Sequence, residues 1–174
     1  AHGTGSSSAI ISDTGCQLAD VTQCPTGVAR GARLVPLRID KSVVIFNTKR
    51  LARALLDASG DNRNRVKTDT DLAGIAMGGP PSWSLWKAVR KAEERGFIIV
   101  AASGNYVRLV VWPARFDSVI SVAAVNAECK PWVHSSRGRG VDIAAPGESV
   151  WRGPMAGDDL DVQITSMGTG TTYG

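Results

Sequence analysis

The stretch GFIIVAASGN, Gly96 to Asn105, decides how the rest of this sequence is interpreted. It opens on a glycine that ends a helical pattern, continues as an unbroken apolar run from Phe97 to Ala102, and closes with the small tripeptide SGN. An apolar run without polar alternation is typical of a strand that is buried on both faces of a parallel sheet. Because such sheets bind ligands at the carboxyl ends of their strands, we expect Asn105 to lie at a binding site.

Length and composition indicate one domain with a hydrophobic core, since the chain has 174 residues of which 43% are hydrophobic. The apolar runs are far shorter than the roughly 20 residues that a membrane helix needs, so we expect no membrane partner. The sequence begins at Ala1 without a charged leader and an apolar stretch. We therefore expect a piece that begins within a domain.

The charge pattern argues against nucleic-acid binding, although the net charge is +4 and the pI is about 9.2. Basic residues cluster at Asn62–Lys67 and Arg137–Arg139, and neither cluster is interleaved with aromatic residues that could stack on bases. We expect these clusters to be solvated loops and predict no nucleic-acid partner.

The three cysteines have no metal-binding spacing and no histidine at zinc-finger distance. Cys16 and Cys24 could close a loop in an oxidising compartment, and the sequence leaves this open, as it does the state of Cys129.

Apolar spacing predicts two helices on either side of a charged connector. The first runs from Asn47 to Ser59, with Asn47 as N-cap and an apolar face of Leu51, Ala54, Leu55 and Ala58 before Gly60. The second starts near Ser82 or Ser84, buries Leu85, Ala88, Val89 and Ala92, and ends at Gly96. A short helical pattern also ends with Ala9, Ile10 and Ile11.

Strand candidates alternate with these helices, and each is a short apolar run. They are Gly31–Ile39, which Pro36 demotes to an edge or a bulge, and Asp71–Met77, Phe97–Ala102, Ser118–Asn126 and Val141–Gly147. This alternation predicts an α/β fold with a mainly parallel sheet, flanking helices and right-handed crossovers.

Several sequence blocks, taken in order, resemble the subtilisin-like serine peptidases, or subtilases. They are HGTG at His2–Gly5 with GVARGARLVPLRI after it, IAMGGPP, AASGN at Ala101–Asn105, WPARFDSVISVAAVN, and VDIAAPG. The resemblance covers nearly the whole chain. It implies part of a subtilisin-like three-layer domain over residues 1–174, which starts at the histidine motif and ends at the nucleophile motif.

The resemblance implies peptide hydrolysis by a hydroxyl nucleophile, which needs a base, a group that orients the base, and donors for the oxyanion. His2 matches the base, and Asn105 matches the residue whose side-chain amide donates to the oxyanion. Judged locally, Asn105 would be an ordinary turn residue, and only the surrounding blocks favour the catalytic role. Two short segments would line the primary specificity pocket: Ala76, Met77, Gly78 and Gly79 on one side, and Ala102, Ser103 and Gly104 on the other. Ala76 replaces a serine common in the family.

The nucleophile motif, Gly-Thr-Ser in the family, has two possible registers in SMGTGTTYG. One register places Gly170 at the nucleophile position and leaves no hydroxyl. The other places Thr172 there, followed by Tyr173 and Gly174 as the family's aromatic and small residues, and we favour it. Because its β-methyl restricts χ1, Thr172 is compatible with an active peptidase, with a slow one, or with a domain that has lost catalysis and binds peptide.

The orienting acid is missing from its family position, since Asp13-Thr14-Gly15 resembles the family's Asp motif but follows the histidine. In a helix that starts at His2, Asp13 would lie about 16 Å along the axis, too far to hydrogen-bond the imidazole. We therefore expect the acid upstream of Ala1 and the helix of the nucleophile beyond Gly174. On that expectation, the 174 residues alone hydrolyse nothing and fold poorly.

Other residues carry weaker predictions. We expect no cofactor; calcium is frequent in the family, and Asp158, Asp159 and Asp161 form only a weak candidate. Pro113 after Trp112 occupies a position where subtilases sometimes have a cis proline, and an ordinary loop proline fits equally well. Trp83 and Trp86 could contact substrate, although packing is the commoner role of large aromatics. His134, in a polar loop, is expected to be solvated.

Three classes of function follow from these observations. The first is a serine-type endopeptidase domain whose partner is a peptide or protein substrate, secreted on the evidence of the resemblance alone. The second is a catalytically dead subtilase-fold domain that binds peptide or is structural. A nucleotide-binding domain is weaker, because the glycines at 78–79 and 168–170 lack dinucleotide or phosphate-loop spacing.

Overall fold

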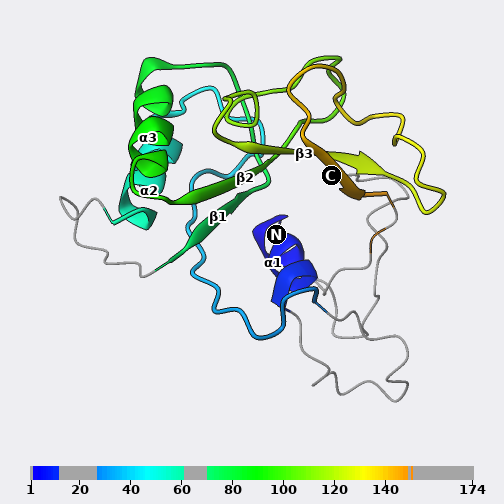
Figure 1. Cartoon of the computed structure of the whole chain (residues 1–174), viewed down its shortest axis with the longest axis horizontal. Helices are drawn as coiled ribbons and strands as arrows, with labels where there is room; N and C mark the ends of the chain where they lie inside the picture. Colours follow the sequence, from blue (N-terminus) through cyan, green and yellow to red (C-terminus); the bar gives the residue numbers. More distant parts are fainter. Residues whose placement is uncertain (1, 12–26, 61–69, 149, 151–174) are drawn as a thin grey trace. The chain divides into compact units, whose positions relative to one another are not determined.

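The computed structural model describes residues 2–11, 27–60, 70–148 and 150. The chain forms two compact units, one made of Ala1–Pro36 with Glu148–Tyr173 and the other of Leu37–Gly147 with Gly174. The first unit contains α1 (His2–Ile11), which confirms the helical pattern at the start of the sequence. All the other helices and strands of the described residues, which Figure 1 labels, belong to the second unit.

In the first unit, a turn closes on the last residues of α1. The backbone N–H of Val28 donates to the carbonyl of Ala9 at 3.1 Å, and that of Ala29 donates to the carbonyl of Ile10 at 2.8 Å. Carbonyls in the last turn of a helix have no partner within the helix, so these bonds satisfy two of them.

The second unit is built on a four-stranded sheet in which every neighbouring pair is parallel. Its strands are β1 (Leu72–Ile75), β2 (Ile98–Ala102), β3 (Ile120–Val125) and β4 (Ile143–Pro146), in the spatial order β1-β2-β3-β4. In the register of the sheet, Leu72 lies beside Ile98, Val100 beside Ile120, and Val122 beside Ile143. The four strands predicted after residue 70 are therefore confirmed, with slightly shorter bounds.

The predicted strand Gly31–Ile39 is wrong, because residues 32–40 form neither helix nor strand. The segment crosses the boundary between the two units, which falls after Pro36. Pro36 also lacks the N–H that a ladder would need.

Helix α2 (Lys49–Ala58) confirms the first predicted helix, with two corrections. The N-cap is Thr48, without a side-chain capping bond, and not Asn47, whose side-chain oxygen instead accepts a hydrogen bond from the N–H of Lys49 at 3.2 Å. The buried face contains Ala52 where Ala54 was predicted.

Helix α3 (Trp83–Glu93) follows its prediction closely, and its buried residues are the predicted Leu85, Ala88, Val89 and Ala92. Ser82 is the N-cap, and its hydroxyl accepts a hydrogen bond from the N–H of Leu85 at 3.2 Å. Gly96, with φ of 72°, adopts the left-handed conformation after the helix that glycine tolerates best. The chain can then turn directly into β2.

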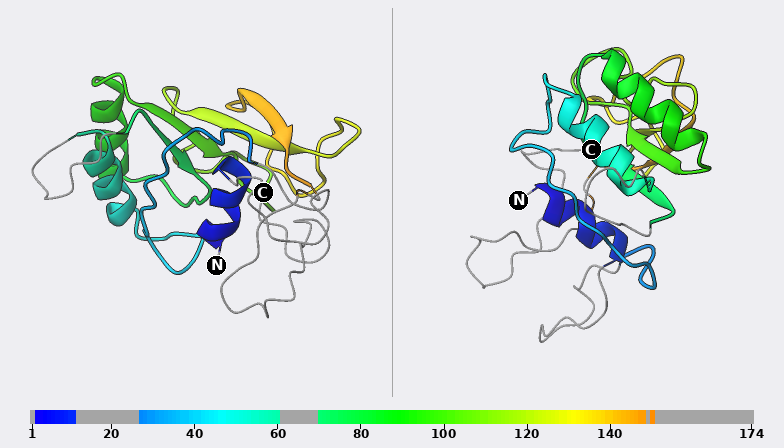
Figure 2. Two further views of the ribbon diagram at one scale, coloured as in Figure 1. Left: turned by 90° about the horizontal axis from the view of Figure 1, so that it is seen from below. Right: turned by 90° about the vertical axis from the view of Figure 1, so that its left-hand side faces the viewer.

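The core of the second unit lies between α2, α3 and one face of β1 and β2, and Figures 1 and 2 show the two helices side by side beside these strands. The buried hydrophobic residues that form it are Ile45, Leu51, Ala52, Leu55, Ala58, Ile75, Leu85, Ala88, Val89, Ala92, Phe97, Ile99, Ala101, Val110, Ala114 and Val119.

The prediction that β2 is buried on both faces is wrong for the described chain. Ile99 and Ala101 are buried against the helices, whereas Ile98 is 49% exposed and Val100 is half-buried. The same outer face of the sheet carries Leu72, Ile120 and Ile143, all of them exposed. The cause is that both helices of the second unit cover the same face.

Candidate active site

The predicted pocket residues of the second unit gather at one edge of the sheet. Ala76–Gly79 follow β1 directly, and Ser103–Asn105 follow β2. Because β1 and β2 are neighbouring parallel strands, their carboxyl ends lie at the same edge. The two segments predicted to form the walls of the pocket are thus brought together by the fold.

Val111 and Trp112 connect these two walls through backbone hydrogen bonds. The N–H of Val111 donates to the carbonyl of Ser103 at 2.9 Å. Trp112 and Gly79 form an antiparallel bridge, with N–H to carbonyl distances of 3.0 and 3.2 Å. The separation of the walls is therefore set by the residues just before the turn at Pro113.

Gly78 and Gly79 are approached closely by the protein's own backbone. The N–H of Gly78 donates to Val43 at 3.0 Å, and its carbonyl accepts from Ile45 at 2.9 Å. A methyl group built on Gly79 would overlap the carbonyl oxygen of Ile45. Glycine is therefore required here by internal packing, independently of any contact with substrate.

The side chain of Val111 occupies the space between the two walls. A methyl group built on Gly78 would lie 2.5 Å from Cγ2 of Val111, and one built on Gly104 would lie 3.0 Å from the same atom. Gly104 also has φ of 109°, a conformation that side chains rarely adopt. Val111 thus narrows any pocket formed by these glycines.

The loop that contains Asn105 is hydrogen-bonded to residues 134–136. Asn105 forms an antiparallel bridge with Ser135. The carbonyl of Gly104 accepts from the N–H of Ser136 at 2.8 Å, and the hydroxyl of Ser136 donates to the carbonyl of Val107 at 2.8 Å. Ser136 is fully buried, and these bonds fix the half-buried Asn105 relative to the sheet.

Aromatic residues lie next to the bridge between Asn105 and Ser135. Tyr106, with φ of 63°, is in a conformation that is uncommon for residues with side chains and that occurs often at functional sites. Its ring lies 4.7 Å from that of His134, and the buried Trp132 lies 5.1 Å from His134. His134 is exposed as predicted, but it packs against two rings rather than only against solvent.

The remaining catalytic predictions fall outside the second unit. His2 is the first residue of α1, in the first unit. Thr172 and Asp13 lie outside the described residues, as do Cys16, Cys24 and the weak calcium candidate Asp158–Asp161. Within residues 2–11, 27–60, 70–148 and 150, no three or more His, Cys, Asp and Glu side chains are grouped to hold a metal ion.

The sequence interpretation missed the structural role of Val111 and of the buried Ser135 and Ser136. In the sequence, Val111 is marked only as the second residue of an apolar pair before Trp112. Ser135 and Ser136 are marked only as a pair of serines in a loop that also contains charged residues. The peptide bond between Trp112 and Pro113 is cis, which confirms the resemblance at that position.

Comparison with known proteins identifies the family of this chain. The sequence model described as the Subtilase family matches residues 1–173. The chain therefore belongs to the subtilase family. Its parallel sheet with flanking helices is the α/β architecture of the subtilisin-like fold.

Among similar sequences, Subtilisin Savinase of Lederbergia lenta is 31% identical over 145 residues, which cover 82% of this chain and 51% of that protein. Subtilisin DY of Bacillus licheniformis is 38% identical over 103 residues, covering 56% of this chain and 38% of the relative. The chain thus spans about half or less of the length of these relatives.

A solved structure with a similar fold is that of the patellamide maturation protease PatA. It has a TM-score of 0.75 and 22% identity, and the match covers 99% of this chain and 60% of that one. At this identity, the likeness supports the fold alone.

Proposed function

We propose that this chain forms part of the catalytic domain of a subtilisin-like serine-type endopeptidase. The observation that carries the proposal is the sheet edge at which Asn105 follows β2 while Ala76–Gly79 follow β1, in a chain that belongs to the subtilases. An oxyanion donor beside a backbone-lined wall is the arrangement that hydrolysis of an extended peptide requires.

In the proposed reaction, His2 accepts the proton of the Thr172 hydroxyl as its oxygen attacks the carbonyl carbon of the scissile bond. The side-chain amide of Asn105 donates to the carbonyl oxygen as it becomes negative. The tetrahedral intermediate then expels the amine, which takes the proton from His2 and leaves an acyl group on Thr172. Attack by water, assisted again by His2, releases the carboxylic acid and restores the hydroxyl.

We infer that the substrate residue on the amino side of the scissile bond has a small side chain. Support comes from Val111, whose methyl groups lie against both Gly78 and Gly104, the two glycines of the predicted pocket. Ala76 and Met77 line one side of this pocket, and Ala102 and Ser103 the other. A large aromatic side chain would compete with Val111 for the same space.

We further infer that the protein acts outside the cell on peptides or proteins. Support comes from a relative named Extracellular protease in Xanthomonas campestris pv. campestris, 32% identical over 143 residues. Among the described residues, no helix is both long and apolar enough to cross a membrane. The proposed chemistry uses side chains only and needs no cofactor.

A fluorophosphonate probe tests the proposed activity, because it forms a covalent bond only with an activated hydroxyl. In the natural full-length protein we expect labelling that Thr172→Ala abolishes. Asn105→Ala should slow labelling about 100- to 1000-fold. Asn47→Ala, which removes an exposed amide at the start of α2, is the control and should label at the normal rate.

Absence of labelling and of proteolysis in the unsubstituted protein would overturn the peptidase proposal. Retained peptide binding in that protein would then identify the alternative, a subtilase-fold domain that has lost catalysis.

A further inference from the structure

Both backbone groups of Gly78, in the pocket wall that follows β1, are bonded to the protein's own chain. The N–H of Gly78 donates to the carbonyl of Val43 at 3.0 Å, and its carbonyl accepts from the N–H of Ile45 at 2.9 Å. Val44 and Gly78 thereby form an isolated parallel bridge. An extended peptide that adds a strand to this wall would need the same two groups. Val44 therefore occupies a position that a substrate residue would take.

The neighbour of the wall on its other side is held by buried residues. Gly79 and Trp112 bond to each other in both directions, at 3.0 and 3.2 Å. Val110 and Ala114, on either side of Trp112 in the sequence, are buried in the core. Displacing Trp112 would therefore disturb the core, so a peptide joins the wall more easily from the side of Val43–Ile45.

The segment Ser42–Val44 is exposed by comparison. The side chain of Val44 is 56% exposed, and Ser42 is exposed as well. The N–H of Val44 donates to the hydroxyl of Ser42 at 3.2 Å, a bond that stays within the segment. Ile45, in contrast, has its side chain in the core. A rotation of the backbone at Ile45 would turn the bonded groups away from Gly78 while this side chain stays in place.

We propose that Ser42–Ile45 forms an autoinhibitory latch, which closes the pocket wall at Gly78 and moves aside when an extended peptide binds. The proposal rests on the peptidase function proposed above and adds a closed state to the same site. The two hydrogen bonds of Gly78 are exchanged for two bonds to the backbone of the substrate. Because only the open fraction of the protein binds, the latch weakens the apparent affinity for extended peptides in proportion to that fraction.

The latch should affect long substrates and not short ones. Val111–Trp112 lies between the two walls of the pocket and bonds to each of them. At about 4.8 Å between neighbouring strands, the two walls are roughly 10 Å apart. One extended residue spans about 3.3 Å, and four residues span about 13 Å. A substrate with a single residue before the scissile bond is therefore too short to reach from Asn105 to Gly78.

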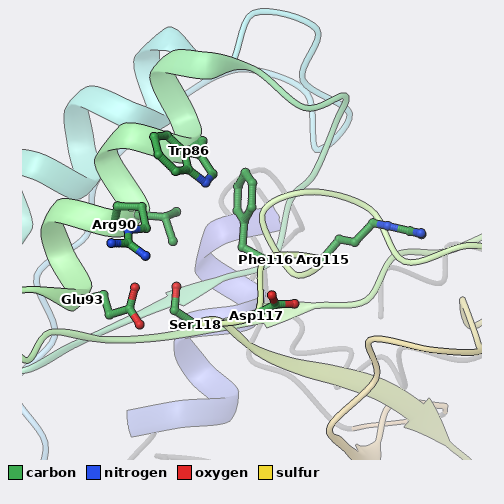
Figure 3. A pocket seen from close by; sticks show the side chains of 8 residues that line it. Trp86, Arg90, Glu93, Arg115, Phe116, Asp117 and Ser118 are labelled. Atoms are coloured by element: carbon green, nitrogen blue, oxygen red, sulfur yellow. The ribbon is translucent and has the colours of Figure 1, made fainter.

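The cavity beside α3 is a separate hollow of the second unit, and Figure 3 shows it from close by. It has a volume of about 260 Å³ and is lined by Glu93 and Asp117 together with Arg90 and Arg115, so it does not select one sign of charge. None of its lining residues belongs to the pocket walls or to the latch. A substitution in this cavity, Arg90→Gln, therefore serves as a control for where a peptide binds.

Hydrogen exchange of the full-length protein, followed by NMR, measures opening of the latch without any substrate. Val44→Gly should favour the open latch, because glycine loses the most conformational freedom when a segment is held in place. We expect the amide of Gly78 to exchange about two- to fivefold faster in this variant. The amide of Gly79, which donates to Trp112, should keep its rate. Val28→Gly, the same substitution at an exposed residue of the first unit, should leave both amides unchanged.

Peptide binding tests whether a substrate takes the place of the latch. The probe is a fluorescein-labelled tetra-alanine amide, and its binding to full-length Thr172→Ala protein is followed by fluorescence anisotropy. Adding Val44→Gly should tighten binding about two- to fivefold, the same factor as for exchange. Ser42→Ala, which removes the acceptor of the Val44 N–H, should act in the same direction. Arg90→Gln and Val28→Gly should leave the affinity unchanged, and circular dichroism checks that each variant is folded.

Two chromogenic substrates extend the test to the protein with Thr172 intact. In Val44→Gly protein, kcat/KM for acetyl-tetra-alanine p-nitroanilide should rise about two- to fivefold. The value for acetyl-alanine p-nitroanilide should stay the same, because this substrate does not reach Gly78.

Faster exchange at Gly78 without tighter binding of the tetra-alanine peptide would overturn the proposal, because the segment would open without making room for a substrate. An equal acceleration at Gly79 would also overturn it, since the whole wall would then have loosened. Equal gains for the long and short substrates, or no peptide binding by any variant, would do the same. Exchange and binding are measured without turnover. If both change as expected while neither p-nitroanilide is cleaved, the latch belongs to a peptide-binding domain and the peptidase proposal fails.

Discussion

Replacing Gly79 with alanine perturbs the wall of the site at a defined point. The added methyl group would overlap the carbonyl oxygen of Ile45 and lie 3.3 Å from Cγ1 of the same residue. Since the overlap is with backbone, rotation of a side chain cannot relieve it. The segment Val43–Ile45 must then move away from Gly78.

The cost of this movement follows from the contacts that it breaks. The two backbone hydrogen bonds between Val43–Ile45 and Gly78 measure 3.0 and 2.9 Å. At about 0.5–1.5 kcal/mol net for each bond, their loss costs about 1–3 kcal/mol. Ile45 is only 1% exposed, and uncovering part of its side chain adds about 1 kcal/mol. We therefore expect Gly79→Ala to lower the free energy of unfolding by about 2–4 kcal/mol.

Urea denaturation followed by tryptophan fluorescence measures this change, and kcat/KM for a peptide substrate measures the effect on the site. Gly74→Ala in β1 is the matched control, because a methyl group there meets nothing within 4 Å. We expect the control to change stability by less than about 1 kcal/mol and to keep kcat/KM. If Gly79→Ala matched Gly74→Ala in both measurements, the proposed packing of this wall would be refuted.

Four further substitutions test other parts of the second unit. Val111→Ala should raise kcat/KM for substrates with large side chains relative to small ones by about tenfold or more, and an unchanged ratio would exclude Val111 from the pocket. Ser82→Ala removes the hydroxyl that accepts from Leu85 and should lower the free energy of unfolding in urea by about 1 kcal/mol, whereas no change would argue against its capping role. Leu85→Ala, at a fully buried position, should lower the same free energy by about 2–5 kcal/mol; less than 1 kcal/mol would contradict its place in the core. Ser121→Ala removes a buried hydroxyl without a partner among the described residues and should leave stability equal or about 1 kcal/mol higher, so a clear loss in urea would show that the hydroxyl is bonded.

Local patterns predicted the helices and strands of the second unit well. Gly96 is an example, since a glycine after a helical pattern usually marks a left-handed turn, and φ there is 72°. The apolar face of α3 was also predictable from the sequence, because the 3.6-residue period of apolar positions depends only on the helix itself. Asn105 was found through its position at the end of an apolar strand and through the resemblance to subtilases.

Long-range packing was not predictable from such patterns. The apolar run from Phe97 to Ala102 is compatible with burial on both faces, and only the placement of both helices on one side leaves Ile98 exposed. Val111 is an ordinary apolar residue in the sequence. Its position between Gly78 and Gly104 depends on a turn in which Val111 bonds to Ser103 and Trp112 bonds to Gly79, which lies 33 positions earlier in the sequence.

The loop after β2 has a further consequence for the time course of hydrogen exchange. The amides of Val111 and Ser136 donate to Ser103 and Gly104 at 2.9 and 2.8 Å, beside buried serines, so they should exchange with deuterium only when the sheet edge opens. Asn105 follows Gly104 directly and bridges to Ser135. Its position is therefore fixed during folding, and the entropic cost of ordering it does not recur each time a substrate binds.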